Sequence, residues 1–165
     1  MPRRLLLAML CGVLGASCGG GSSASSTTRN AVRALGGKSH LVAVAYRSFS
    51  AAQKDCLDQF NAGILTTDAE GTACIDKGLT ASKLESSIER LRRQVVAVEQ
   101  AGSPECAAAA KRLADMVQRE EDAVHALHAD LANLDVQRFN GDFEAAGSAA
   151  TRERPLFDTL LGACT

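Results

Sequence analysis

The sequence contains no tryptophan, one tyrosine and only three prolines among its 165 residues. Because stacking on aromatic rings supplies much of the contact with nucleobases and sugars, we do not expect a binding platform for either ligand. Scarce proline and abundant alanine favour helices. The sequence also lacks an apolar run long enough to cross a membrane. Its most apolar stretch, residues 5–14, is about half the length of roughly 20 residues that a spanning helix needs.

No charge of one sign predominates in the chain. Lysine and arginine total 18 against 19 acidic residues, so the formal net charge is −1 at pH 7. This balance provides neither the basic surface that nucleic acids require nor an acidic tail. Gly37-Lys38-Ser39 resembles the end of a phosphate-binding loop, but Val32 stands where the first glycine of that motif belongs. We therefore expect no nucleic acid, no nucleotide and no enzymatic activity.

The first 18 residues predict export from the cytoplasm. Two arginines precede the apolar residues 5–14, and small residues then lead to a cysteine, which is typical of a signal peptide. The end of this segment, Leu14-Gly-Ala-Ser-Cys18, resembles the lipobox of bacterial lipoproteins, in which the signal is removed just before an acylated cysteine. Gly15 departs from that pattern, which more often has an aliphatic residue. The resemblance implies a signal peptide over residues 1–17 and a covalent lipid on Cys18.

The segment after Cys18 resembles a tether. It is rich in glycine and serine up to residue 28 and has almost nothing to bury, so we expect a flexible coil. We assign residues 18–38 to the lipidated cysteine and linker and residues 39–165 to the folded domain. By similarity to lipoprotein sorting in Gram-negative bacteria, Gly19 in place of aspartate favours the outer membrane, with either its periplasmic or its surface face.

Apolar residues that recur every three or four positions predict four helices. The first begins at Ser39, after two glycines, and ends near Asn61, although residues 41–46 alone could also form a strand. Residues 62–79 are rich in glycine, threonine and aspartate, which predicts a loop. A further short turn of helix is compatible with residues 29–35.

The later helices have clearer start signals. Ser82 and Glu85 match a capping box at the start of the second helix, and Ser103 with its following proline opens the third. The Asn-Gly pair at residues 140–141 is expected to end the third helix, before a fourth begins at Asp142. Two apolar seams predict the packed faces: Leu84, Ile88, Leu91, Val95 and Val98 on the second helix, and Leu113, Val117, Glu120, Val124, Leu127, Leu131 and Leu134 on the third.

Four helices with short connections predict an all-α fold, an up-down-up-down four-helix bundle. In that topology Cys56 and Cys74 lie near one end and Cys106 and Cys164 near the other. Of the three pairings that four cysteines allow, we therefore expect Cys56–Cys74 and Cys106–Cys164. One difficulty is that the third helix looks longer than the fourth. Cys164 reaches Cys106 only if Pro155 unwinds the fourth helix or the third helix is shorter than the pattern indicates.

The strongest chemical cluster lies on the expected third helix. Glu121, His125 and His128 are spaced at i, i+4 and i+7 and share one side of a helix. Two imidazoles and a carboxylate suit zinc, copper or iron, and His40 could join them. A solvated helix face with incidental histidines is the alternative. We expect no cofactor other than the covalent lipid, with a metal possible at these residues.

Three further residues are candidates for contact with a partner. Glu120 occupies a seam position, where an unpartnered carboxylate is costly; it could pair with a basic residue, reach the edge of the core or contact a partner protein. Arg90 and Arg93 share one side of the second helix and could contact lipid phosphates or an acidic partner, or form a solvated face.

These features predict a lipid-anchored envelope protein that reaches the membrane through its lipid and binds a protein partner without catalysis. A metal- or haem-binding periplasmic carrier or sensor that uses His125 and His128 is the alternative hypothesis.

Overall fold

The computed structural model describes residues 26–164, with Thr27 described by its backbone alone. All regular structure in this range is helical, which confirms an all-α domain. The helices are α1 (Ser26–Asn61), α2 (Asp68–Ser82), α3 (Leu84–Ala101), α4 (Pro104–Ala132) and α5 (Val136–Cys164). Within the described range, no helix is both long enough and apolar enough to cross a membrane. The signal peptide and Cys18 lie outside the described residues.

Helix α1 begins well before Ser39, so the assignment of residues 26–38 to a flexible linker is wrong. Two side chains of this extension are buried in the core: Val32 is 3% exposed and Leu35 is 0% exposed. Burial of each side chain stabilises the helix by about 1.5–3 kcal/mol, whereas each of the two following glycines costs about 1 kcal/mol in helix propensity. Packing therefore outweighs the glycine pair that suggested a break.

Helix α2 occupies most of the segment expected to be a loop, residues 62–79. Its start is a capping box: the Thr67 hydroxyl accepts a hydrogen bond from the Glu70 N–H, and the Glu70 carboxylate accepts one from the Thr67 N–H. This arrangement satisfies backbone donors that the first turn of a helix leaves free. The glycine and threonine content of the segment favoured a loop, and the capping box formed by Thr67 and Glu70 was not recognised as a helix start.

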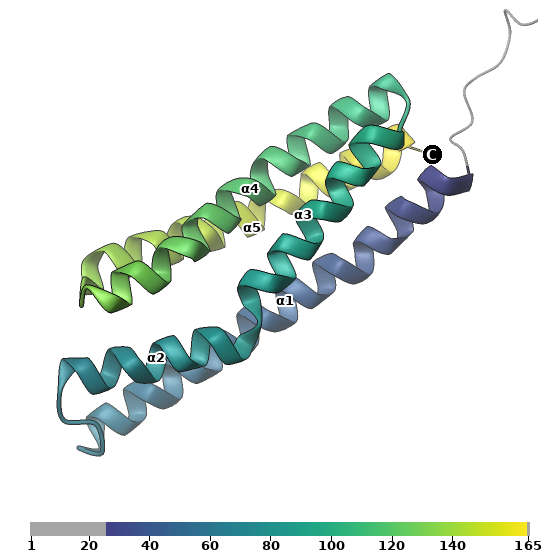
Figure 1. The fold of residues 1–165 in the computed structure, drawn as a ribbon. Coiled ribbons are helices and arrows are strands. Elements are labelled where there is room, and N and C mark those ends of the chain that lie inside the picture. The colour runs from purple at the N-terminus through teal and green to yellow at the C-terminus, as the bar shows by residue number, and fades with distance from the viewer. Residues whose placement is uncertain (1–25, 165) are drawn as a thin grey trace, which may run out of the picture.

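A single residue, Lys83, separates α2 from α3 and has a φ of 59°. The Ser82 hydroxyl donates to the Leu79 carbonyl and accepts from the Leu84 N–H. The capping box expected between Ser82 and Glu85 is therefore not formed. Figure 1 shows that the helix axis bends at this junction, so that α2 and α3 together form one bent rod.

Both expected seams lie in the core. The five seam residues of α3 are 0% exposed, and α3 ends before Gly102 as expected. Ser103 caps α4 by accepting from the Cys106 N–H, and the following proline occupies the first turn. The α4 seam is buried as far as Leu131, but Leu134 lies beyond the helix and is 50% exposed.

The turn between α4 and α5 lies at residues 133–135, earlier than the Asn-Gly pair at residues 140–141 indicated. Asp135 stabilises the new start, because its carboxylate accepts from the Arg138 N–H in the first turn of α5. Pro155 does not interrupt α5. With these boundaries α4 and α5 each have 29 residues, which removes the expected mismatch in length.

The structure pairs the cysteines as expected. Cys56–Cys74 joins α1 to α2 with an S–S distance of 2.00 Å, and Cys106–Cys164 joins the start of α4 to the end of α5 with an S–S distance of 2.01 Å. The second bridge forms because two helices of equal length run back along each other from the turn at residues 133–135.

The domain has two distinct ends (Figure 1). The start of α1, the α3–α4 turn and the end of α5 gather at one end, which we call the proximal end. There the Thr28 hydroxyl donates to the Ala101 carbonyl. The opposite end, which we call the distal end, contains the α1–α2 connection and the α4–α5 turn. The chain therefore enters the domain at the proximal end.

Candidate functional site

A groove opens at the distal end between α2 and the end of α4. Small side chains of α2, those of Ala69, Thr72 and Ala73, form one wall, and the other wall is formed by Leu131, Ala132 and Leu134. The volume of this part is about 510 Å³.

A second hollow of about 190 Å³ shares a wall with the first, and all four helices of the distal end line it, with Leu57, Val136 and Phe139 among its residues. Since Thr72 and Leu131 line both parts, we treat them as one feature, the distal groove.

Large apolar side chains of the distal groove are exposed to water. Leu57 is 59% exposed, Val136 is 60% exposed and Leu134 is 50% exposed. Leu134 also has a φ of 56°, a left-handed conformation that costs a residue with a Cβ about 1–2 kcal/mol. This conformation ends α4 in a Schellman cap, because the Leu134 N–H donates to the Leu131 carbonyl and the Asp135 N–H donates to the Asp130 carbonyl. Leucine in place of the usual glycine at this position leaves an apolar side chain in solvent.

In the part of the chain that the structure describes, the distal groove is lined by three aspartates, Asp76, Asp130 and Asp135, and by no lysine or arginine. Asp76 is paired with His128, with 2.6 Å between Oδ1 and Nδ1. Asp135 caps α5. Asp130 differs from both, because it is 5% exposed and its Oδ2 atom lacks a hydrogen bond of ordinary geometry, although the Asp142 carboxyl lies against it. Burial, and then the neighbouring Asp142, raise the pKa of Asp130 above its usual range.

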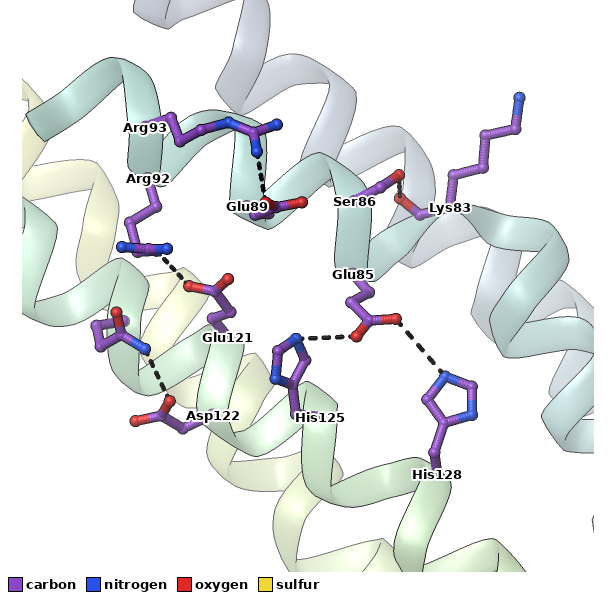
Figure 2. Close-up of polar contacts among 11 residues, drawn as sticks. Lys83, Glu85, Ser86, Glu89, Arg92, Arg93, Glu121, Asp122, His125 and His128 are labelled. Atoms are coloured by element: carbon purple, nitrogen blue, oxygen red, sulfur yellow. Dashed lines mark hydrogen bonds and ion pairs between the residues drawn. The ribbon is translucent and has the colours of Figure 1, made fainter. Parts of the chain in front are cut away.

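The two histidines of α4 contact acidic residues on other helices. Figure 2 shows Glu85 of α3 pointing toward both rings. Glu85 Oε1 lies 2.9 Å from His125 Nε2, and Glu85 Oε2 lies 3.9 Å from His128 Nε2. Together with the contact between His128 and Asp76, these pairs join α4 to both halves of the bent α2–α3 rod. All four side chains are partly exposed, so each pair contributes little to stability.

The metal-ligand set expected from the spacing on α4 does not assemble. Glu121 turns away from the histidines toward Arg92 of α3, with 2.5 Å between Arg92 Nε and Glu121 Oε2. Glu121 is 5% exposed, whereas the Arg92 side chain is 34% exposed, so this ion pair lies at the edge of the core. In the described range, no group of three or more histidine, cysteine, aspartate or glutamate side chains could hold a metal ion. Helical spacing put the three residues on one side of α4. It could not show that Glu121 pairs with Arg92 of α3 while both histidines lie near Glu85 of the same helix.

Glu120 is fully buried, at 0% exposure, so it neither reaches the edge of the core nor contacts an outside partner, which were two of its three alternatives. It lies in the core beside Tyr46 of α1 and Glu153 of α5. The three groups are near enough to shift one another's ionisation. Yet the Tyr46 hydroxyl, both carboxylate oxygens of Glu120 and one of Glu153 lack a hydrogen bond of ordinary geometry. No basic side chain neutralises the pair among these neighbours.

Burial raises the pKa of both glutamates of this pair. Desolvation, followed by the adjacent Glu120, raises the pKa of Glu153 to about 10. Desolvation also raises the pKa of Glu120, although hydrogen bonding with Glu153 and Tyr46 opposes the rise. The Tyr46 pKa is raised by burial and then by Glu120. Glu153 is therefore protonated in the folded protein at pH 7, and the cluster affects stability more directly than binding.

The remaining candidates lie on the surface of α3. Arg90 is exposed, and Arg93 pairs with Glu89 one turn earlier, with 2.5 Å between the two atoms. The basic residue of this stretch that reaches another helix is Arg92, which sequence reasoning did not single out. Its position one residue from the seam could have indicated a contact with α4. Arg90 and Arg93 remain candidates for contact with lipid or an acidic partner.

The distal groove was not foreseen in the sequence. It is formed by α2, which was expected to be a loop, and by an α4–α5 turn that was expected several residues later. The sequence signals that could have located them are the Thr67–Glu70 capping box and the cap at Asp135. Comparison of the chain with protein families, with curated proteins and with solved structures finds no match in any of the three.

Proposed function

We propose that the protein is a bacterial envelope lipoprotein whose helical domain is a non-catalytic adaptor for a larger assembly, of the kind used in secretion, motility, adhesion or wall attachment. Cys18 would be the anchor, and Gly19 favours the outer membrane. The rods α1, α2–α3, α4 and α5 would act as one up-down-up-down bundle. The cysteines that the structure describes are all in disulfides, so none of them is available as a nucleophile.

The observation that carries the adaptor role is the distal groove. It combines exposed Leu57, Leu134 and Val136 with a backbone conformation at Leu134 that leucine rarely adopts. The conformation of Leu134 closes the end of α4, but the exposure of these three side chains to water does not stabilise the folded domain. A partner that covered them would recover about 25 cal/mol for each Å² of apolar surface removed from solvent.

The direction of the chain agrees with this role. The lipid anchor would precede α1, which begins at the proximal end, and the groove lies at the distal end (Figure 1). A protein attached through Cys18 would thus present the distal groove away from its membrane, where another protein can reach it.

The anchor is tested by feeding cells a labelled fatty acid and comparing the full chain with its Cys18→Ser variant. We expect label in the native protein, none in the variant, and release of the variant from membranes. Label that persists in the variant, or a native protein that is never acylated, would contradict the proposal.

The adaptor role is tested separately by placing a photoreactive residue at Val136, in the groove, or at Arg112, which lies more than five turns of α4 before the distal end of that helix. We expect a discrete crosslinked adduct from position 136 in intact cells and none from position 112.

A further inference from the structure

We propose that the distal groove binds a basic amphipathic helix of the partner protein, with a lysine or arginine of that helix seated against Asp130. This inference rests on the proposed adaptor function and specifies the chemistry of the partner. Three observations carry it: the shape of the walls, the sign of the charges and an unpaired buried oxygen.

The walls of the groove suit a helix. On the α2 side they consist of Ala69, Thr72 and Ala73, and Ala132 lies on the α4 side. Small residues let a helix approach to the usual 8–10 Å between axes. Leu131 and Leu134 offer apolar surface for the side chains that an amphipathic helix repeats at i, i+3, i+4 and i+7. An extended peptide would have no strand edge to pair with in the described residues, because all of their regular structure is helical.

The charges that line the groove select a cation. Asp76, Asp130 and Asp135 line it, and neither lysine nor arginine is among its described lining residues. Phosphate groups of a nucleic acid or a lipid would be repelled by this surface, whereas lysine and arginine side chains along the edges of a helix would be attracted.

Asp130 has the strongest need for a partner among these three aspartates. His128 partly neutralises Asp76, and Asp135 is engaged as the α5 cap. The Asp130 Oδ2 atom has almost no contact with solvent and no hydrogen bond of ordinary geometry. Its nearest charged neighbours are the Asp142 carboxyl, which can bond to it only through a shared proton, and Arg138, which offsets part of the negative charge. A buried carboxylate oxygen without a donor is costly, and an ammonium or guanidinium group from a bound helix would provide donors and the opposite charge.

The test measures binding of the mature lipidated protein, in a non-ionic detergent, to immobilised helical peptides. The probe is a peptide of about 18 leucine and lysine residues, roughly 27 Å long as a helix, with leucines on one face. The comparison peptide has glutamate in place of lysine. We expect the lysine peptide to bind at least tenfold more tightly. Equal binding of the two peptides would overturn the inference.

Variants of equal charge locate the contact. Asp130→Asn should weaken binding of the lysine peptide at least tenfold. Asp115→Asn is the matched control, because Asp115 is an exposed α4 carboxylate paired with Lys111, and it should change binding by less than twofold. An equal loss in both variants would mean non-specific attraction and would overturn the inference. If Asp130→Asn fails to fold, Val136→Lys at a 60% exposed groove position should weaken binding instead.

The two proposals can fail separately. If position 136 crosslinks to a partner in cells but the lysine peptide shows no dependence on Asp130, the adaptor role stands and the basic-helix inference is wrong. If the peptide binds as expected but position 136 yields no adduct in cells, the adaptor role is wrong.

Discussion

Replacing Glu153 by glutamine should remove much of the pH dependence of the stability of the domain. The carboxyl group of Glu153 is 6% exposed and lies beside Glu120 in the core. Its pKa is raised to about 10 in the folded protein, against roughly 4.3 for a glutamate in an unfolded chain. Between these values the folded state binds one proton more than the unfolded state.

The sign of the effect follows from this difference. A group whose folded pKa is raised contributes its full stability below the unfolded pKa, and that contribution is lost as pH rises toward 10. The loss is about 1.4 kcal/mol per pH unit for one proton, which gives an upper limit of about 4 kcal/mol between pH 5 and pH 8. Glutamine has the same shape, does not titrate, and can still donate a hydrogen bond to Glu120.

The assay is urea unfolding, followed by circular dichroism with both disulfides intact, at several values between pH 5 and pH 8. Glu153→Gln should match the native protein at pH 5 and exceed its free energy of unfolding by several kcal/mol at pH 8. Glu144→Gln, at an exposed position on the same helix, is the control and should follow the native curve. Parallel curves for the native protein and Glu153→Gln would refute the reasoning, because Glu153 would then carry no extra proton in the folded state.

Three further predictions concern backbone and packing. Gly78→Ala should destabilise the domain by about 1–3 kcal/mol in the same urea assay, because the added Cβ would lie 2.6 Å from a side chain of α1. In Gly147→Ala the added Cβ would have no atom within 4 Å, so this variant should stabilise the domain by about 0.5–1 kcal/mol. Leu134→Gly should relieve the positive φ and raise the free energy of unfolding by about 1 kcal/mol, while reducing crosslinking from the groove. A decrease in the free energy of unfolding together with the decrease in crosslinking would contradict this prediction. Replacing Cys106 and Cys164 by alanine should cost about 1 kcal/mol more than removing the α1–α2 bridge, since the bridged residues are 58 apart against 18; equal losses in thermal unfolding would mean that chain entropy does not set the difference.

Local signals in the sequence predicted the middle of the domain well. The α3 seam, the end of α3 before Gly102 and the cap at Ser103 each depend on residues within about two turns of one another. Contacts of this kind form in the same way whatever surrounds them, so spacing and cap chemistry were sufficient there.

Elsewhere, contacts between distant segments overrode the local signals. The glycine pair in α1 indicated a break, but burial of Val32 and Leu35 keeps the helix continuous. Glu120 was correctly placed in a seam, yet its neighbours Tyr46 and Glu153 are far from it in sequence. The direction in which Glu121 points depends on Arg92 of another helix. Such contacts are set by how the helices pack, which periodicity does not specify.

Crosslinking from the distal groove in intact cells is the most direct measurement of the central claim, that this surface binds a partner protein. A photoreactive residue at Val136 should give one discrete adduct, and that adduct should decrease at least tenfold in an Asp130→Asn background while remaining unchanged in an Asp115→Asn background. The same residue at Arg112 should give none. An adduct that forms equally from positions 136 and 112, or no adduct from position 136, would contradict the account.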